Sequence, residues 1–213
     1  MTNRLFLTAA TLLCTFAGSI YGCGNAKNNE PTNTNPNSTE TMSQATPSDT
    51  NKQLETAIFA GGCFWGVQYY FEKAKGVVNT VVGYTGGHVV NPSYEDVCSH
   101  TSGHYEAIKV TYDPKITSYE DMARLFFDIH DPTQTDGQGP DIGEQYMSVI
   151  FYENDAQKAT AQKLIGLLTQ KGMRVATQLI KATTFYPAEN YHQHHYDHEG
   201  GTPYCHRFVD KFN

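Results

Sequence analysis

The segment Gly61–Gly66 holds the cysteine of this chain that is best suited to act as a nucleophile, directly before a phenylalanine and the only tryptophan. The apolar segment Glu55–Ala60 predicts a buried strand before it, and Val67–Lys75 predicts a helix after it. Cys63 should therefore lie at a strand-to-helix turn, where free backbone N–H groups and the helix dipole favour a thiolate. The two aromatic residues could line an apolar substrate pocket beside it.

A carboxylate and two phenols could complete such a site. Glu106 begins an expected strand, and beside aromatic residues its pKa would rise until it became a proton donor near neutral pH. The alternative for Glu106 is a solvated carboxylate at a strand edge. Tyr94 and Tyr146 lie in or beside loops and could hydrogen-bond a polar substrate oxygen, although packing is the default role of a tyrosine. Asp141 could orient them or could be an ordinary turn residue.

Four histidines near the C-terminus raise the question of a metal site: His192, His194, His195 and His198. On a helix they would pair on single faces, but the adjacent loops carry no matching set of ligands at short, fixed spacing. We therefore expect no metal. The net charge of −7 argues against a surface that binds nucleic acid.

The N-terminal region predicts export. Residues 1–22 have a basic start, an apolar stretch too short for a membrane span and a small-residue end, as a signal peptide does. The Ile-Tyr-Gly sequence before Cys23 is similar to the lipobox of bacterial lipoproteins, and an ordinary cleaved signal is the alternative. Residues 23–54 are polar and predict a disordered tether. We expect an exported protein of the cell envelope or periplasm, held to a bacterial membrane only by a lipid on Cys23.

Three cysteines then remain in the expected folded domain, residues 55–213: Cys63, Cys98 and Cys205. An odd number outside the cytoplasm means that one thiol is free or that the thiols exchange during chemistry. Cys205 lies in a short tail whose mobility would let it approach Cys63. A static Cys63–Cys205 disulfide is the alternative, but a structural bridge needs no helix terminus and no apolar cleft.

The elements that must position these residues alternate along the chain. After the first strand and helix we expect strands at 77–84, 106–112, 148–152 and 175–180, and helices at 118–130 and 155–170. Polar loops cover 88–105 and 131–146, and the region after 184 has weak periodicity. This pattern predicts an α/β or α+β sandwich.

Several motifs in one order resemble those of the A-type peptide methionine sulfoxide reductases, which act on methionine-S-sulfoxide. They are Gly-Cys-Phe-Trp-Gly at 62–66, Gly-Tyr-Thr-Gly-Gly at 83–87, Asn-Pro-Ser-Tyr-Glu-Asp-Val-Cys-Ser at 91–99, Gly-His-Tyr-Glu-Ala at 103–107, Gln-Gly-Pro-Asp-Ile-Gly at 138–143 and Phe-Tyr-Pro-Ala-Glu at 185–189. The resemblance covers residues 56–205 and implies an α+β two-layer sandwich whose mixed sheet has a ferredoxin-like core. Two departures are Tyr105, where alanine is usual, and His100, where glycine is common.

The resemblance also implies roles in the reaction. Cys63 matches the nucleophile, Glu106 the acid that protonates the sulfoxide oxygen, Cys205 the resolving cysteine and Cys98 a non-catalytic thiol. Attack would release methionine and leave a sulfenic acid on Cys63, and Cys205 would condense with it to a disulfide and water. A thioredoxin-like dithiol would reduce that disulfide, with no metal or organic cofactor. We expect a monomer that acts on free or protein-bound methionine sulfoxide.

Five further residues match the family's substrate site. Phe64 and Trp65 correspond to the walls of the pocket for the methyl group, and Tyr94 and Tyr146 to hydrogen-bonding partners of the sulfoxide oxygen. Asp141 corresponds to a loop aspartate nearby.

Two other functions stay open on the residues. One is a general thiol–disulfide or peroxide reductase, on which peroxide or a disulfide would outcompete methionine sulfoxide. The other is a metal-binding surface lipoprotein that uses the histidine-rich tail.

Overall fold

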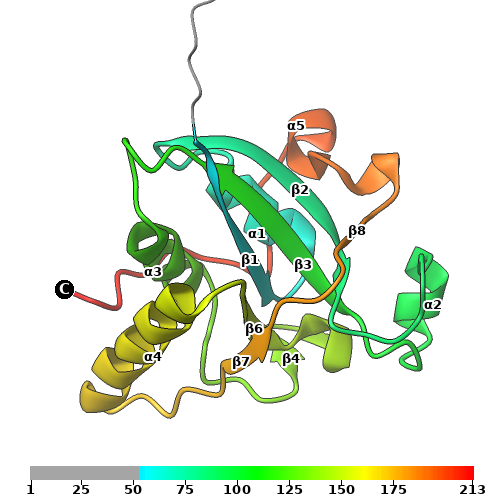
Figure 1. The fold of residues 1–213 in the computed structure, drawn as a ribbon. Helices are drawn as coiled ribbons and strands as arrows, with labels where there is room; N and C mark the ends of the chain where they lie inside the picture. Colours follow the sequence, from blue (N-terminus) through cyan, green and yellow to red (C-terminus); the bar gives the residue numbers. More distant parts are fainter. Residues whose placement is uncertain (1–52) are drawn as a thin grey trace, which may run out of the picture. The chain divides into compact units, whose positions relative to one another are not determined.

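The computed structural model describes residues 53–213, which are built around a mixed sheet (Figure 1). The strand order is β7-β6-β1-β3-β2-β8, formed by β1 (Glu55–Gly61), β2 (Val77–Thr85), β3 (Tyr105–Tyr112), β6 (Ser148–Tyr152), β7 (Gln178–Lys181) and β8 (Tyr186–Pro187). β6 and β7 run parallel, and the other neighbouring strands run antiparallel. The expected α+β class is confirmed. The predicted signal peptide, Cys23 and nearly all of the tether lie outside the described residues.

Three helices bury apolar side chains against this sheet: α1 (Phe64–Phe71), α3 (Tyr119–Ile129) and α4 (Asp155–Gln170). Shorter elements lie in the connections and the C-terminal region: α2 (Tyr94–Cys98), the hairpin of β4 (Gly137–Gln138) and β5 (Asp141–Ile142), the 3-10 turns η1 (Glu144–Tyr146) and η2 (Asn190–His192), and α5 (His195–Glu199). Of the helices between residues 53 and 213, none has the length and apolar character that a bilayer span requires.

The side chains of β1 alternate between two apolar clusters. Ala57 and Phe59 belong to the main core with the three larger helices, whereas Ile58 and Ala60 pack with Phe151 in a second cluster. Successive side chains of a strand point to opposite faces, so β1 is buried on both. This double burial explains why the strand before Cys63 has a nearly continuous apolar sequence.

Most element boundaries follow the sequence prediction, and local signals explain the differences. Ser118 and Asp121 form a capping box at the start of α3, since each side chain accepts a hydrogen bond from the other's backbone N–H. α1 begins and ends earlier than expected, at Phe64 and Phe71. α2 lies inside the segment expected to be a loop, although Ser93 and Asp96 form a second capping box there.

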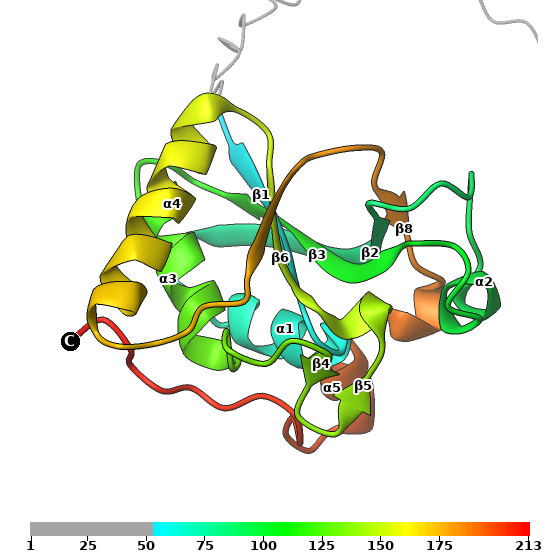
Figure 2. The same cartoon turned by 90° about the horizontal axis from the view of Figure 1, so that it is seen from below.

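The C-terminal segment, red in Figure 2, runs from α5 past α1 toward α3. It is fixed by backbone hydrogen bonds: the N–H of Arg207 donates to the carbonyl of Ile129 at 3.1 Å, and that of Val209 donates to Asp128 at 2.8 Å. We expected tail mobility to bring Cys205 to Cys63. In the structure the tail is anchored, and Cys205 already lies beside Cys63, as described below.

Candidate active site

Cys63 is the N-cap residue of α1 and follows β1 after one glycine. That glycine, Gly62, has a φ of +96°, which L side chains rarely adopt. In the first turn, the N–H of Phe64 donates a 3.1 Å hydrogen bond to Oε2 of Glu106, and the N–H of Trp65 bonds the sulfur of Cys63. The free N–H groups of the helix terminus therefore bind the two side chains that were expected to carry out the chemistry.

The resting thiol of Cys63 is protonated. A hydrogen bond with the Cys205 side chain raises the pKa of Cys63 most strongly, and burial raises it further. The hydrogen bond from the N–H of Trp65 lowers this pKa and so opposes both effects. A partner that binds the neutral thiol, in surroundings that penalise charge, outweighs the helix terminus. The predicted resting thiolate is therefore wrong, and Cys63 must lose its proton as it attacks.

Glu106 is buried, with 2% of its surface exposed. Burial raises the pKa of Glu106 well above its ordinary value, the nearby Cys63 raises it further, and the hydrogen bond from Phe64 only partly opposes them. The expected rise in pKa is confirmed, and the solvated-edge alternative is wrong. A carboxyl group whose pKa is raised in this way is suited to hold a proton and donate it.

Tyr94 and Tyr146 lie close enough to Glu106 for its charge to affect both phenols. Burial raises the pKa of each phenol most strongly, and the nearby Glu106 raises both pKa values further. Both hydroxyls therefore stay protonated as donors. Tyr94 is held by its backbone N–H, which donates to Oε1 of Glu189 at 2.9 Å. The structure brings these two residues together with Glu106, as expected.

Two histidines of the C-terminal region hold the Trp65 indole. Its Nε1–H donates to Nδ1 of His192 at 3.1 Å, and its ring stacks on His195 with centroids 3.7 Å apart. Phe64 is only 1% exposed and belongs to the main core, with its ring 5.0 Å from that of His192. Trp65 is half-buried, so it is the more accessible of the two expected pocket walls, and Phe64 lies deeper.

Asp141 lies near the same groups and has a different partner from those considered. Its charge raises the pKa of both Cys63 and Glu106. The hydroxyl of Tyr204 donates to its two carboxylate oxygens at 2.9 and 3.0 Å. Asp141 therefore orients Tyr204, a tyrosine of the tail next to Cys205, instead of Tyr94 or Tyr146.

All three thiols of residues 53–213 are free in this structure. Cys205 hydrogen-bonds with Cys63, whereas Cys98 hydrogen-bonds with the phenol of Tyr94. Cys205 is therefore the thiol placed to react with Cys63. A static disulfide does not describe this state of the protein.

Sequence reasoning missed His206. Its imidazole is 5% exposed, its Nε2 lies 2.7 Å from the carbonyl oxygen of Gly61, and its Nδ1 lies 3.1 Å from Sγ of Cys205. A Cβ added to Gly66 would collide with Nδ1, so this position of the glycine-rich segment must stay without a side chain. That glycine was the signal in the sequence, but its partner lies far along the chain.

Two departures from the family motifs are accommodated. His100 has a φ of +60°, in the left-handed region where glycine is common, and its Nδ1 pairs with Oε1 of Gln145 at 2.9 Å. Tyr105 packs on Phe151 in the second apolar cluster, with ring centroids 5.6 Å apart. Because neighbouring side chains of a strand alternate, Tyr105 faces away from the site that Glu106 enters.

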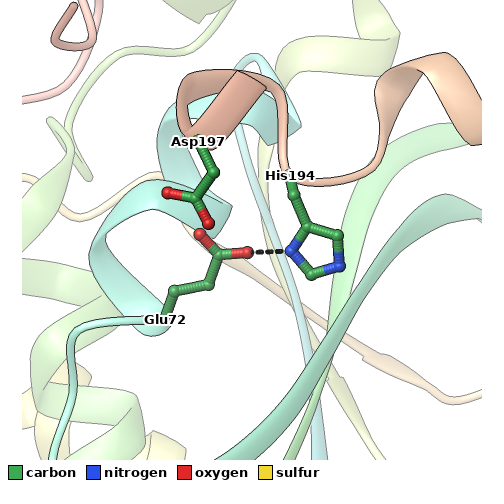
Figure 3. Close-up of side chains that lie close together, drawn as sticks. All are labelled: Glu72, His194 and Asp197. Carbon is green, nitrogen blue, oxygen red and sulfur yellow. Dashed lines mark hydrogen bonds and ion pairs between the residues drawn. The ribbon is translucent and has the colours of Figure 1, made fainter. Parts of the chain in front are cut away.

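Figure 3 shows the group among residues 53–213 whose side chains could together offer three ligands to a metal: Glu72, His194 and Asp197. Nδ1 of His194 is hydrogen-bonded to Oε1 of Glu72. Glu72 ends α1, while His194 and Asp197 lie at the start of α5. The contact joins α1 to α5, and this structural role accounts for the close approach of the three side chains.

Comparisons with known proteins agree with this geometry. The sequence profile of the family described as peptide methionine sulfoxide reductase matches residues 55–212. The chain is 43% identical to the peptide methionine sulfoxide reductase MsrA of Sulfolobus acidocaldarius over 158 residues, which cover 74% of this chain and 90% of that protein. The reduced form of Mxr1 from Saccharomyces cerevisiae is similar with a TM-score of 0.68 and 32% identity, over 73% of this chain and 92% of that chain. Mxr1 in complex with Trx2 gives a TM-score of 0.50 and 26% identity, over 78% and 96%.

Proposed function

The chain belongs to the peptide methionine sulfoxide reductase family and reduces methionine-S-sulfoxide to methionine, and we propose that Cys63 is its nucleophile and Glu106 its acid. The observation that carries this assignment is the first turn of α1. There the helix holds the Cys63 sulfur and the buried Glu106 carboxyl, whose pKa is raised, through neighbouring backbone N–H groups. No metal or organic cofactor is needed for this step.

In the proposed first step, the sulfur of Cys63 attacks the sulfoxide sulfur as the sulfur–oxygen bond of the substrate breaks. Glu106 gives its proton to the departing oxygen, and the thiol proton of Cys63 returns to the carboxylate. The hydroxide released from the substrate then attacks the Cys63 sulfur, the sulfur–sulfur bond formed by the first attack breaks, and methionine leaves while Cys63 keeps the oxygen as a sulfenic acid. Tyr94 and Tyr146 donate hydrogen bonds to the substrate oxygen while it gains charge.

The pocket for the methyl group follows from the aromatic contacts. Trp65 is fixed by His192 and His195, so it presents a rigid apolar wall beside Cys63. Phe64 closes the deeper end. A methyl group has no hydrogen-bonding capacity, so an aromatic surface favours it over a polar substituent.

We propose that Cys205 resolves the sulfenic acid. Its thiol already hydrogen-bonds with Cys63, so condensation to a disulfide needs little movement. The products are the Cys63–Cys205 disulfide and water. Cys98, bound to Tyr94, supports the hydroxyl network and takes no part in this exchange.

The proposed reductant is a thioredoxin-like protein, as the complex of Mxr1 with Trx2 suggests for a relative. It must attack the disulfide through the accessible side of Cys205. A cavity of about 250 Å³ opens there and is lined in part by Cys205, Arg207 and Lys211. Exposed apolar side chains of the tail, Tyr204 and Phe208, lie on either side of Cys205 in sequence and suit a protein partner.

A stopped assay with the two separated sulfoxide epimers tests the proposed function. We expect reduction of the S epimer only, with loss of activity in Cys63→Ser. Full activity of Cys63→Ser would overturn the nucleophile assignment. Faster turnover with hydrogen peroxide or a small disulfide than with methionine-S-sulfoxide would favour a general thiol reductase instead.

We also propose export and lipid attachment at Cys23, on the support of the sequence of residues 1–23 alone. Mass spectrometry of the mature N-terminus tests this proposal. A mature chain that starts at Cys23 and carries a lipid mass is the expected result, and an unmodified chain that starts elsewhere contradicts it.

A further inference from the structure

The protonation of His206 is fixed by its two partners. A carbonyl oxygen can only accept a hydrogen bond, so the contact of 2.7 Å between Nε2 and Gly61 requires a proton on Nε2. A neutral imidazole carries one proton, which leaves Nδ1 as an acceptor. Burial lowers the pKa of His206 to about 4, so the neutral form prevails at neutral pH.

The partner of Nδ1 must then be a donor. The sulfur of Cys205 lies 3.1 Å from Nδ1, and only its S–H proton can make this contact favourable. With that proton directed at His206, the Cys205 sulfur presents its lone pairs to the neighbouring thiol of Cys63. The three residues thus form a row in which protons point from Cys63 to Cys205 and from Cys205 to His206.

The imidazole is held in place by packing as well as by hydrogen bonds. A Cβ added at Gly66 would collide with its Nδ1, and one at Gly62 would come within 3.3 Å of its Cε1. The ring therefore lies against the first turn of α1, which also carries Cys63. Because the imidazole packs against the turn that carries the Cys63 sulfur, Nδ1 can stay at the same distance from the Cys205 sulfur while the two sulfurs react.

We propose that His206 is a catalytic base of the resolving step, whose Nδ1 takes the thiol proton of Cys205 as that sulfur attacks the sulfenic acid on Cys63. The inference rests on the proposed role of Cys205. One sulfur–sulfur bond forms and the S–OH bond of Cys63 breaks. The proton on Nδ1 then passes to the departing hydroxide, so that water leaves and His206 returns to its neutral form.

The test is a single turnover of the reduced full-length protein with methionine-S-sulfoxide and no reductant. Methionine release reports the first step, dimedone labelling counts sulfenic acid on Cys63, and mass spectrometry counts the Cys63–Cys205 disulfide. In His206→Ala and His206→Gln we expect disulfide formation to slow by about 100-fold relative to methionine release, a typical effect of losing a general base. Sulfenic acid should then accumulate in these variants, whereas the wild-type protein should convert it to the disulfide.

Two features separate a lost base from a disturbed fold. Gln can keep a donor toward Gly61 while lacking a base at the position of Nδ1, so His206→Gln retains the anchoring contact without the proton acceptor. Free imidazole should restore disulfide formation in His206→Ala, where the ring has left a cavity, and not in Cys205→Ser. His198→Ala is the matched control, since His198 is an exposed histidine of α5, and it should behave as wild type.

The pH dependence of the wild-type protein gives a readout that does not require a variant. Near His206 lie the ionisable groups Cys205, Asp141 and His130, and Asp141 raises the pKa of His206 against burial. Disulfide formation should be constant from pH 8 to about 6 and fall tenfold per unit once Nδ1 is protonated near pH 4.

Disulfide formation within threefold of wild type in a folded His206 variant would overturn the inference, as would a wild-type rate that stays constant below pH 4. If both variants fail to fold, the wild-type pH profile decides. Failure of the proposed function would look different from failure of this inference. Without the reductase activity the wild-type protein would release no methionine, and without a resolving role for Cys205 the Cys205→Ser variant would turn over normally with reductant.

Discussion

The backbone N–H of Phe64 donates a 3.1 Å hydrogen bond to Oε2 of Glu106, although 42 residues separate the two in the chain. The contact joins the start of α1 to the start of β3, and it places the carboxyl beside Cys63. Glu106 is also buried, and burial raises its pKa well above the ordinary value, which favours the protonated acid. The same turn thus presents the proposed nucleophile and the proposed proton donor to one substrate.

Replacing Glu106 with glutamine tests the role of its proton. Glu106→Gln should lower the rate of methionine release by about 10²- to 10⁴-fold, the usual range for a lost general acid. Reduction of a preformed Cys63–Cys205 disulfide by dithiothreitol should be unchanged, since no sulfoxide is present. Quenched-flow assays of the two half-reactions measure both rates. An equal loss in both would indicate a structural effect.

The raised pKa of Glu106 also predicts how stability varies with pH. Above its ordinary pKa of 4.5, native Glu106 holds a proton that the unfolded chain has released, so the free energy of unfolding falls as pH rises through the folded-state pKa. Glu106→Gln has no proton to lose. The thermal midpoint of Glu106→Gln, measured by calorimetry, should therefore rise relative to that of wild type as the pH increases from 5 to 9. A constant difference across this range would mean that Glu106 ionises normally in the folded protein.

The sequence predicts the strand-to-helix turn at Cys63 because its signals are local. An apolar run, two glycines and an aromatic pair lie within a few residues of Cys63, and the carboxyl that joins them begins a strand with clear alternation. α4 and the cap at Ser118 are likewise encoded by nearby residues. α2 is only five residues long, too short for helical periodicity to show, so only its capping box could have revealed it.

The protonation of Cys63 could not be predicted locally. A helix terminus lowers the pKa of a thiol, but the hydrogen bond of Cys63 with Cys205 and burial reverse the direction. The tail that carries Cys205 has no periodic pattern, and its position depends on contacts such as that of His206 with Gly61, 145 residues away in sequence. Long-range contacts of this kind leave little local trace. The same holds for the histidines that fix Trp65.

A side chain at Gly66 should disturb the site through His206. Gly66→Ala places a Cβ against Nδ1 of the buried imidazole, and such overpacking costs about 1–3 kcal/mol of stability. Gly166→Ala is the matched control, because its Cβ meets nothing within 4 Å and alanine favours a helix by about 0.5–1 kcal/mol. Urea denaturation of both variants measures the contrast. A Gly66→Ala protein as stable as Gly166→Ala would show that the ring is free to move aside.

The exposed apolar tail should matter for the protein reductant only. Phe208 is 52% exposed, and Phe208→Ser should raise the KM for thioredoxin several-fold while leaving turnover with dithiothreitol unchanged. Ile116→Ser is the control, since Ile116 is 51% exposed and follows the end of β3 that pairs with the start of β1, away from Cys63. Steady-state assays with both reductants provide the comparison. An equal rise in KM for both variants would place the docking surface elsewhere.

The contacts of the three thiols predict which of them turns the enzyme over. Cys205 hydrogen-bonds with Cys63, whereas Cys98 is bound to Tyr94, so only Cys205 can condense with the sulfenic acid without rearrangement. Cys205→Ser should release one equivalent of methionine and then stop with thioredoxin as reductant, while Cys98→Ser should keep turning over. Methionine counted per enzyme, with dimedone labelling of Cys63, distinguishes the two. The contrary result is turnover that Cys205→Ser sustains and that the Cys98→Ser/Cys205→Ser double variant loses. That result would assign the resolving role to Cys98 and would contradict the role proposed for the anchored tail.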